Sequence, residues 1–145
     1  MIRSEPEYQR ARTRLGEDQE IIETQRNVFL DRGLTDEETE KALEPMISFR
    51  AQPEDEVSWY ERVRRRDFGV LENLSALGTT LIALRIANGF SQKELADRMG
   101  VSEAQVSRDE RNEYHGITIE RAQKVLDAMG ETLESRVEDK PLTPA

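Results

Sequence analysis

One stretch of the chain, residues 91–110, constrains the fold more than any other. Ser91 and Glu94 have the spacing of a capping box, which begins a helix. Gly100 supplies the left-handed backbone that a tight turn requires, and Ser102 then caps a second helix. The spacing predicts two short helices that meet at a sharp angle across a three-residue turn.

The segments on either side of this motif are also expected to be helical. An apolar stretch with helical spacing runs from Val70 to Asn88. Gly78 lies inside it and marks either a break or a close contact between helices. After the motif, Thr118 caps a helix with one apolar face, and Gly130 ends it. The motif is therefore the centre of a small helical domain.

The N-terminal half is predicted to contain three further helices. Ser4 begins the first, which ends near Gly33. Thr35 begins the second in another capping box, and Pro45 disturbs it. Pro53 opens the third. The apolar face of the first helix is weak, so this half is expected to bury it against a neighbour.

Composition supports an all-helical protein and excludes several classes of site. The chain has 145 residues, with only 8 Gly and 5 Pro to interrupt helices. It has no Cys and one His, so we expect neither disulfides nor a metal site, and no cofactor. No apolar run approaches a membrane span, and the first residues lack the apolar stretch of a signal peptide, so we expect a cytoplasmic protein. No catalytic set is recognisable, so we do not expect an enzyme.

Charge is distributed unevenly along the chain. The formal net charge is −9, which argues against a protein that coats nucleic acid without sequence preference. Residues 1–77 carry 12 Lys and Arg against 18 Asp and Glu, whereas residues 78–136 carry 8 against 10. Any affinity for DNA must therefore depend on which face holds the few cations of the second half.

The motif resembles the Cro/repressor-type helix-turn-helix family, also called the XRE type. The matching residues are Ser91-Gln92, Leu95-Ala96, Gly100-Val101, Val106-Ser107 and Glu110, preceded by Leu81-x-x-Leu84-Arg85 and followed by a fourth helix from Ile119 to Gly130. The resemblance covers about 55 of the 145 residues. It implies an all-α fold: an N-terminal helical extension plus a compact helix-turn-helix domain of the phage-repressor type, with a short C-terminal strand as one option.

The resemblance also implies a set of DNA-binding residues. These are Gln92, Ser102, Glu103, Ala104, Ser107, Arg108, Arg111 and Asn112. Residues 103–108 include the side chains that face base edges, and Arg108 suits bidentate contact with guanine. Gln92 is expected to contact a phosphate or to support the second helix. Arg111 and Asn112 lie where the following loop meets the DNA backbone. For each residue the alternative is an ordinary solvated side chain.

Two other residues have a structural role in this comparison. Glu110 sits near the end of the second helix, where a carboxylate facing DNA would be repelled by phosphates. In related proteins this glutamate pairs with an arginine of the first helix, a position that Arg85 occupies. We therefore expect an ion pair that ties the two helices together.

The function expected from these features is that of a sequence-specific transcriptional regulator. It would be a repressor that binds a palindromic operator as a homodimer, with its recognition helices about one DNA turn, ~34 Å, apart. The alternative is an antitoxin that binds a small basic toxin and represses its own operon, because the layout resembles host-inhibition-type antitoxins. A basic run in the acidic half, Arg62, Arg64, Arg65 and Arg66, is either a solvated helix face or an extra phosphate contact.

The expected organisation has three parts: an N-terminal helical region for dimerisation or partner binding (1–68), the helix-turn-helix DNA-binding domain (69–131) and a short strand or flexible tail (132–145). The surfaces available for a dimer are the N-terminal helices and the tail around Leu133 to Val137. We favour the helices, with Tyr8, Leu15 and Ile22 as exposed apolar positions.

Overall fold

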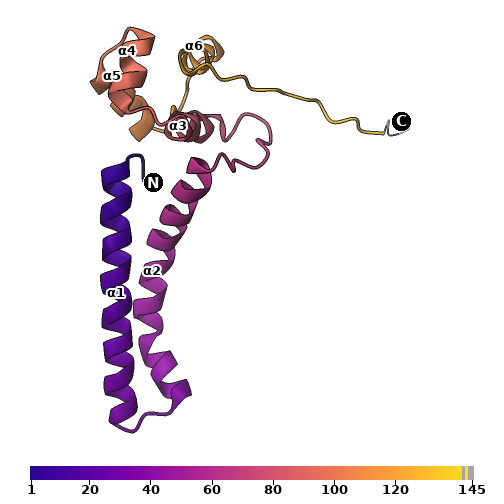
Figure 1. The fold of residues 1–145 in the computed structure, drawn as a ribbon. Helices are drawn as coiled ribbons and strands as arrows, with labels where there is room; N and C mark the ends of the chain where they lie inside the picture. Colours follow the sequence, from indigo (N-terminus) through magenta and orange to yellow (C-terminus); the bar gives the residue numbers. More distant parts are fainter. Residues whose placement is uncertain (142, 144–145) are drawn as a thin grey trace.

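The computed structural model describes residues 1–141 and 143, and within that range the chain forms helices and no strand (Figure 1). The helices are α1 (Glu5–Asp31), α2 (Asp36–Arg64), α3 (Leu77–Ala87), α4 (Gln92–Met99), α5 (Glu103–Arg111) and α6 (Ile119–Met129). The all-α prediction is confirmed. Helices α1 and α2 form a long antiparallel hairpin that projects from the four shorter helices (Figure 1).

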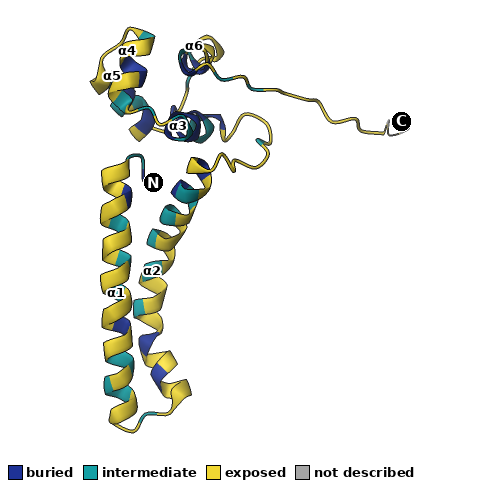
Figure 2. Cartoon of the chain, viewed as in Figure 1, coloured by how far each residue is buried: buried dark blue, intermediate teal, exposed yellow. Residues whose placement is uncertain are grey.

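The hairpin is held together by few buried side chains. Ser4 and Thr35 cap its two helices, each accepting a hydrogen bond from the amide three residues on. Along its length Ile22 and Leu43 are buried, but most of both helices is exposed (Figure 2). At its root Tyr8 stacks on Tyr60, with ring centroids 4.9 Å apart. The core of the hairpin is therefore thin except where it meets the rest of the protein.

The expected break at the prolines of α2 is wrong. Pro45 and Pro53 both lie inside one continuous helix rather than between two. The helix bends in the part nearest the hairpin turn (Figure 1), as proline-containing helices do. Leu43 before the prolines and Tyr60 after them are both buried. Packing against α1 on both sides of the prolines offsets the hydrogen bonds that they remove.

The helix expected from Val70 begins seven residues later, at Leu77. Asn73 has a φ of 58°, a left-handed conformation that a right-handed helix cannot contain. Val70 and Leu74 are 89% and 59% exposed, so the apolar pattern there does not mark a buried face. From residue 131 to residue 141 the chain forms neither a strand nor a helix, and the last part of the expected tail, residues 142, 144 and 145, lies outside the described residues.

The root of the hairpin shares one hydrophobic core with α3–α6. Ile2, Tyr60 and Val63 are buried in the same cluster as side chains of all four shorter helices. Tyr8 also belongs to this cluster, and Ile22 is buried deeper in the hairpin. The expectation that Tyr8 and Ile22 are exposed is therefore wrong, because α2 covers the apolar face of α1.

Gly78 marks a close contact rather than a break in α3. A Cβ added there would lie 1.9 Å from the backbone oxygen of Glu113, in the loop after α5. We expect Gly78→Ala to lower the free energy of unfolding by ~1–3 kcal/mol, because the loop must move away. Gly16→Ala is the matched control: Gly16 also lies inside a helix but has open space around it, so alanine there should stabilise by ~0.5–1 kcal/mol. Equal effects in denaturant unfolding would contradict this explanation.

Glu131, directly after α6, ties the hairpin to the rest of the protein. Its carboxylate accepts hydrogen bonds from Asn88 Nδ2 at 2.7 Å and from Arg66 at 2.8 Å. The bond from Asn88, then the bond and charge of Arg66, hold the pKa of Glu131 below its ordinary value. A lowered pKa in the folded state stabilises above the ordinary Glu pKa, and this contribution is lost as pH falls through the lowered value.

We therefore expect Glu131→Gln to be less stable than the wild type at neutral pH. The difference in free energy of unfolding should shrink as the pH falls from about 7 to about 3, because the wild-type carboxylate is then protonated. Urea unfolding across this range measures it, and Glu134→Gln in the exposed tail is the control. A difference that stays constant with pH would contradict the assignment.

Candidate nucleic-acid interface

Helices α4 and α5 begin and end as the motif predicts. The Ser91 side chain accepts from the Glu94 amide at 3.0 Å, and the Glu94 carboxylate accepts from the Ser91 amide at 2.7 Å. The hydrogen bond from the Ser91 amide, and after it one from the Ser91 side chain, stabilises the charged carboxylate and lowers the pKa of Glu94. Gly100 ends α4 with a φ of 69°, and Ser102 caps α5. The two helices pack against each other across this tight turn (Figure 1).

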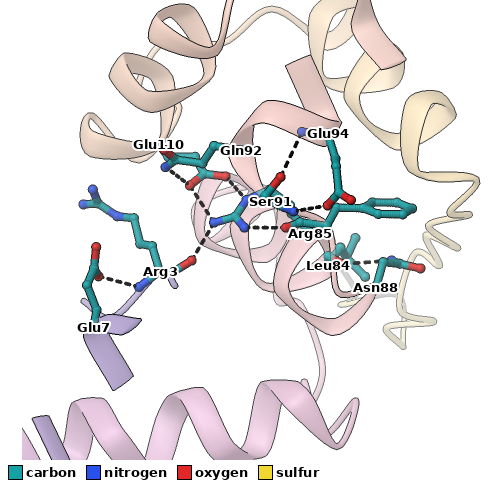
Figure 3. A network of polar contacts seen from close by, with 10 residues as sticks. Arg3, Glu7, Leu84, Arg85, Asn88, Ser91, Gln92, Glu94 and Glu110 are labelled. Carbon is teal, nitrogen blue, oxygen red and sulfur yellow. Dashed lines mark hydrogen bonds and ion pairs between the residues drawn. The ribbon is translucent and has the colours of Figure 1, made fainter. Parts of the chain in front are cut away.

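The structure contains the ion pair between Arg85 of α3 and Glu110 of α5 that the sequence predicts (Figure 3). Their side chains are only 3% and 0% exposed. Arg85 Nε and Nη2 donate to the two carboxylate oxygens of Glu110, the second at 2.9 Å. Arg85 also donates to two backbone oxygens. Its Nη1 donates to the oxygen of Phe90 at 2.7 Å, and its Nη2 donates to the oxygen of Arg3 at 2.8 Å. The pair is buried and well supplied with hydrogen bonds.

Gln92, in the first turn of α4, joins this network from the other side. Its Nε2 donates to Glu110 Oε2 at 2.7 Å (Figure 3). Gln92 therefore supports α5, which is one of the two roles expected for it. Because Glu110 accepts from both Arg85 and Gln92, three helices are locked around one carboxylate.

The residues expected to face base edges lie together on the outer side of α5. Glu103, Ala104 and Arg108 are exposed, and Ser107 is half-buried. Their spacing places them on one face of the helix, which Arg111 extends by a further turn. Val106 and Glu110 point inward and are buried. Helix α5 thus presents a mostly polar outer face, and its buried side chains Val106 and Glu110 fix the direction in which that face points.

The remaining expected contacts lie at the two ends of α5. Ser102 is exposed, and its Oγ accepts from the Gln105 amide at 3.2 Å, which leaves its hydroxyl hydrogen as a donor. Asn112 is the C-terminal cap residue and is exposed. The loop that follows is longer than a single turn, and His115 within it is exposed.

Sequence analysis missed a second network, which positions Arg108. Arg108 Nη2 donates to Gln105 Oε1 at 2.9 Å, and Gln105 Nε2 donates to Asp109 at 3.0 Å. Asp109 in turn forms an ion pair at 2.5 Å with Arg121 of α6. The four-residue spacing of Gln105 and Asp109 is a local signal for part of this chain. The link to Arg121 depends on tertiary structure.

The loop after α5 holds another unpredicted residue. Tyr114 is buried. Tyr114 and Glu113 beside it both have a left-handed backbone, with φ values of 52° and 51°. Burial raises the pKa of the Tyr114 phenol. The loop is thus anchored to the core at Tyr114 and lies against α3 at Gly78. This anchoring fixes the course of the loop after Arg111, the last residue of α5, and its C-cap Asn112.

The geometry suits contact with the major groove of DNA. An exposed helix with a polar outer face and one central arginine has the size and the donors that base edges in that groove require. Within residues 1–141 and 143, no cluster of acidic or histidine side chains is arranged to hold a metal ion. In the same residues, no helix has the length and apolar character needed to span a bilayer.

Comparison with known proteins agrees with this geometry. A family model described as helix-turn-helix matches residues 81–135, from α3 to the segment after α6. No curated protein and no solved structure matched the chain. Residues 81–135, 55 of the 145 residues, therefore form a helix-turn-helix domain of the Cro/repressor or XRE type, a family of DNA-binding domains.

Proposed function

We propose that the protein is a repressor that recognises a near-palindromic operator by placing α5 in the major groove. The observation that carries this proposal is the fixed outer face of α5. The face presents Glu103, Ala104, Ser107 and Arg108, while Glu110 is held away from it by Arg85. A recognition helix that is locked before binding loses little conformational freedom when it meets DNA.

Each residue on this face has a chemical role in the proposal. Arg108 donates to O6 and N7 of a guanine, and Glu103 accepts from N4 of a cytosine. Ala104 contacts the methyl group of a thymine. Arg108 is prepared for this contact because Gln105 already holds its guanidinium, through a bond of 2.9 Å.

Backbone contacts fix the register of α5 in the groove. Gln92 stands in the first turn of α4, where backbone amides and the helix dipole favour a phosphate. Ser102 at the start of α5 supplies a hydroxyl donor to the DNA backbone. Arg111 and Asn112 supply donors at its other end.

Two copies are required for useful discrimination. A single recognition helix contacts only a few base pairs, and a genome offers very many competing sites. A two-fold dimer doubles the number of bases read, provided that the half-sites are separated by about one DNA turn or a multiple of it. The operator is therefore proposed to be an inverted repeat.

A gel-shift assay against fragments of the source genome tests the proposal. The fragment upstream of the protein's own gene belongs in the set, because many repressors regulate themselves. We expect at least one fragment to be shifted in the presence of excess random DNA, at a protein concentration where most are not. Equal binding to all fragments, or to none, would contradict the proposal.

One observation favours a second function, that of an antitoxin. The distal part of the hairpin, residues 17–56, carries 13 Asp and Glu against 4 Lys and Arg and projects away from the DNA-binding helices (Figure 1). Such a surface complements a small basic protein. Co-expression with the product of the adjacent gene tests this: a stable complex with a small basic toxin supports it, and separate elution of the two proteins contradicts it.

A further inference from the structure

One side of α1 carries a row of exposed residues whose charge changes sign along the helix. Arg10 and Arg14 lie in its first half, and Glu17 and Ile21 follow at helical spacing, so the four share one side. Ile21 is 54% exposed although it is a large apolar residue. We call these four residues the α1 row.

A shallow apolar groove runs beside the α1 row, between α1 and α2. Its apolar lining is Ala11, Leu15, Ile21 and Ile22 from α1 and Met46, Phe49 and Pro53 from α2, and its charged lining is Arg10, Arg14, Asp18 and Arg50. Phe49 is 84% exposed. A two-helix hairpin with few buried residues gains most from a partner that covers such a groove.

We infer that the partner is a second copy of this chain, which packs the same side of its hairpin antiparallel against the first. The inference rests on the homodimer of the proposed function. Tyr8 and Ile22 are buried within one chain and cannot form the dimer interface, so the inference places it on the exposed α1 row and the groove beside it. The product is a four-helix arrangement in which each hairpin covers the groove of the other.

Charge selects the second copy and its direction. Consider a symmetric antiparallel pair whose two-fold axis passes between residues 15 and 16 of α1. Arg14 of each copy then lies opposite Glu17 of the other, which gives two equivalent ion pairs. Arg10 then lies opposite Ile21, and its aliphatic stem covers that side chain. In a parallel pair Arg10 would face Arg10, and like charges in contact are unfavourable.

The antiparallel arrangement also separates the two DNA-binding domains. Each domain sits at the N-terminal end of its own α1, so the two lie at opposite ends of the shared bundle (Figure 1). With the axis between residues 15 and 16, Glu5 of one copy lies level with Arg26 of the other, so the N-terminal ends of the two α1 helices are ~32 Å apart at 1.5 Å per residue. The DNA-binding domains lie beyond these ends (Figure 1). Half-sites in the operator are therefore expected more than one DNA turn apart, in place of the single turn of ~34 Å.

A charge exchange at one pair of positions tests the interface in the full-length chain. Arg14→Glu places two carboxylates opposite each other, and Glu17→Arg places two guanidinium groups opposite each other. Each variant alone should self-associate about tenfold or more weakly than the wild type, because two like-charge contacts replace two opposite ones. An equimolar mixture of the two variants should form a heterodimer, and the double variant should recover the homodimer.

Sedimentation at micromolar concentration measures these states, with circular dichroism to verify that each variant is folded. Glu20→Arg is the control, because Glu20 is exposed on a different side of α1 and should leave association unchanged. If the wild type is dimeric and both single variants stay fully dimeric, this interface is wrong while the proposed dimeric regulator stands. A wild type that is monomeric with and without DNA would overturn both, and the gel shift would still report DNA binding independently.

Discussion

Replacing Glu110 with alanine is expected to lower the free energy of unfolding by ~3–5 kcal/mol, because it leaves a buried arginine without its counter-charge. Arg85 is 3% exposed and would keep only the backbone oxygens of Phe90 and Arg3 as acceptors. Gln92 would lose its acceptor as well. The loss should be visible as a large shift of the urea midpoint with an unchanged slope.

An exposed ion pair in the same domain provides the control for this prediction. Lys93 and Asp97 lie 3.3 Å apart on α4, and both side chains are 68% exposed. Asp97→Ala should cost only ~0–1 kcal/mol, since solvent screens the pair. If Glu110→Ala cost no more than Asp97→Ala, the buried pair would not be the element that holds α5 in place.

Replacing Arg108 with alanine is expected to remove the preference for operator over random DNA at one base-pair position, while the fold is unchanged. Loss of one bidentate base contact should cost ~1–3 kcal/mol, or about 5- to 150-fold in relative affinity. Arg108 is exposed, and within the described part of the chain its side chain bonds only to Gln105 of its own helix, so its removal should leave the free energy of unfolding nearly unaffected. Competition binding with operator variants measures the effect.

Lys124→Ala separates base recognition from general electrostatics. Lys124 is exposed on α6, and its removal should weaken binding to operator and to random DNA by the same small factor, if at all. Equal losses on both DNAs for Arg108→Ala would show that Arg108 contacts a phosphate instead of a base.

The local features of the DNA-binding half could be predicted because their determinants lie within a few residues of one another. The capping box of Ser91 and Glu94 and the left-handed turn at Gly100 both depend on short-range geometry. The pairing of Arg85 with Glu110 spans 25 residues and was available only through the resemblance to a known family. The residues expected to bind DNA fall on one face because a helical register fixes them together.

The features that sequence analysis missed all depend on tertiary structure. The backbone oxygen of Arg3 reaches Arg85 from 82 residues away, and no local pattern marks a backbone acceptor. Asp109 pairs with Arg121 on another helix. In the hairpin, the sequence shows that Tyr8 belongs to an apolar helix face, but it does not show which helix covers that face. Burial by α2 of the same chain and burial by a second copy therefore give the same sequence pattern.

The continuous α2 is a further case in which packing overrides a local signal. Pro53 is a good first residue of a helix, so its position suggested a new start. In the structure the helix continues through it, since burial of Leu43 and Tyr60 against α1 holds both halves in place. Conversely, the apolar residues from Val70 to Leu74 do not form a helix, and of them only Leu71 packs against the core, while Val70 and Leu74 are exposed.

Selection of bound DNA from a random pool tests the central claim most directly, namely that α5 reads base sequence. We expect rounds of selection with the full-length protein to enrich an inverted repeat. The same selection with Arg108→Ala should lose the preference at one position of each half-site. A pool that stays random after selection, despite measurable binding, would contradict the claim, because binding would then depend on the DNA backbone alone.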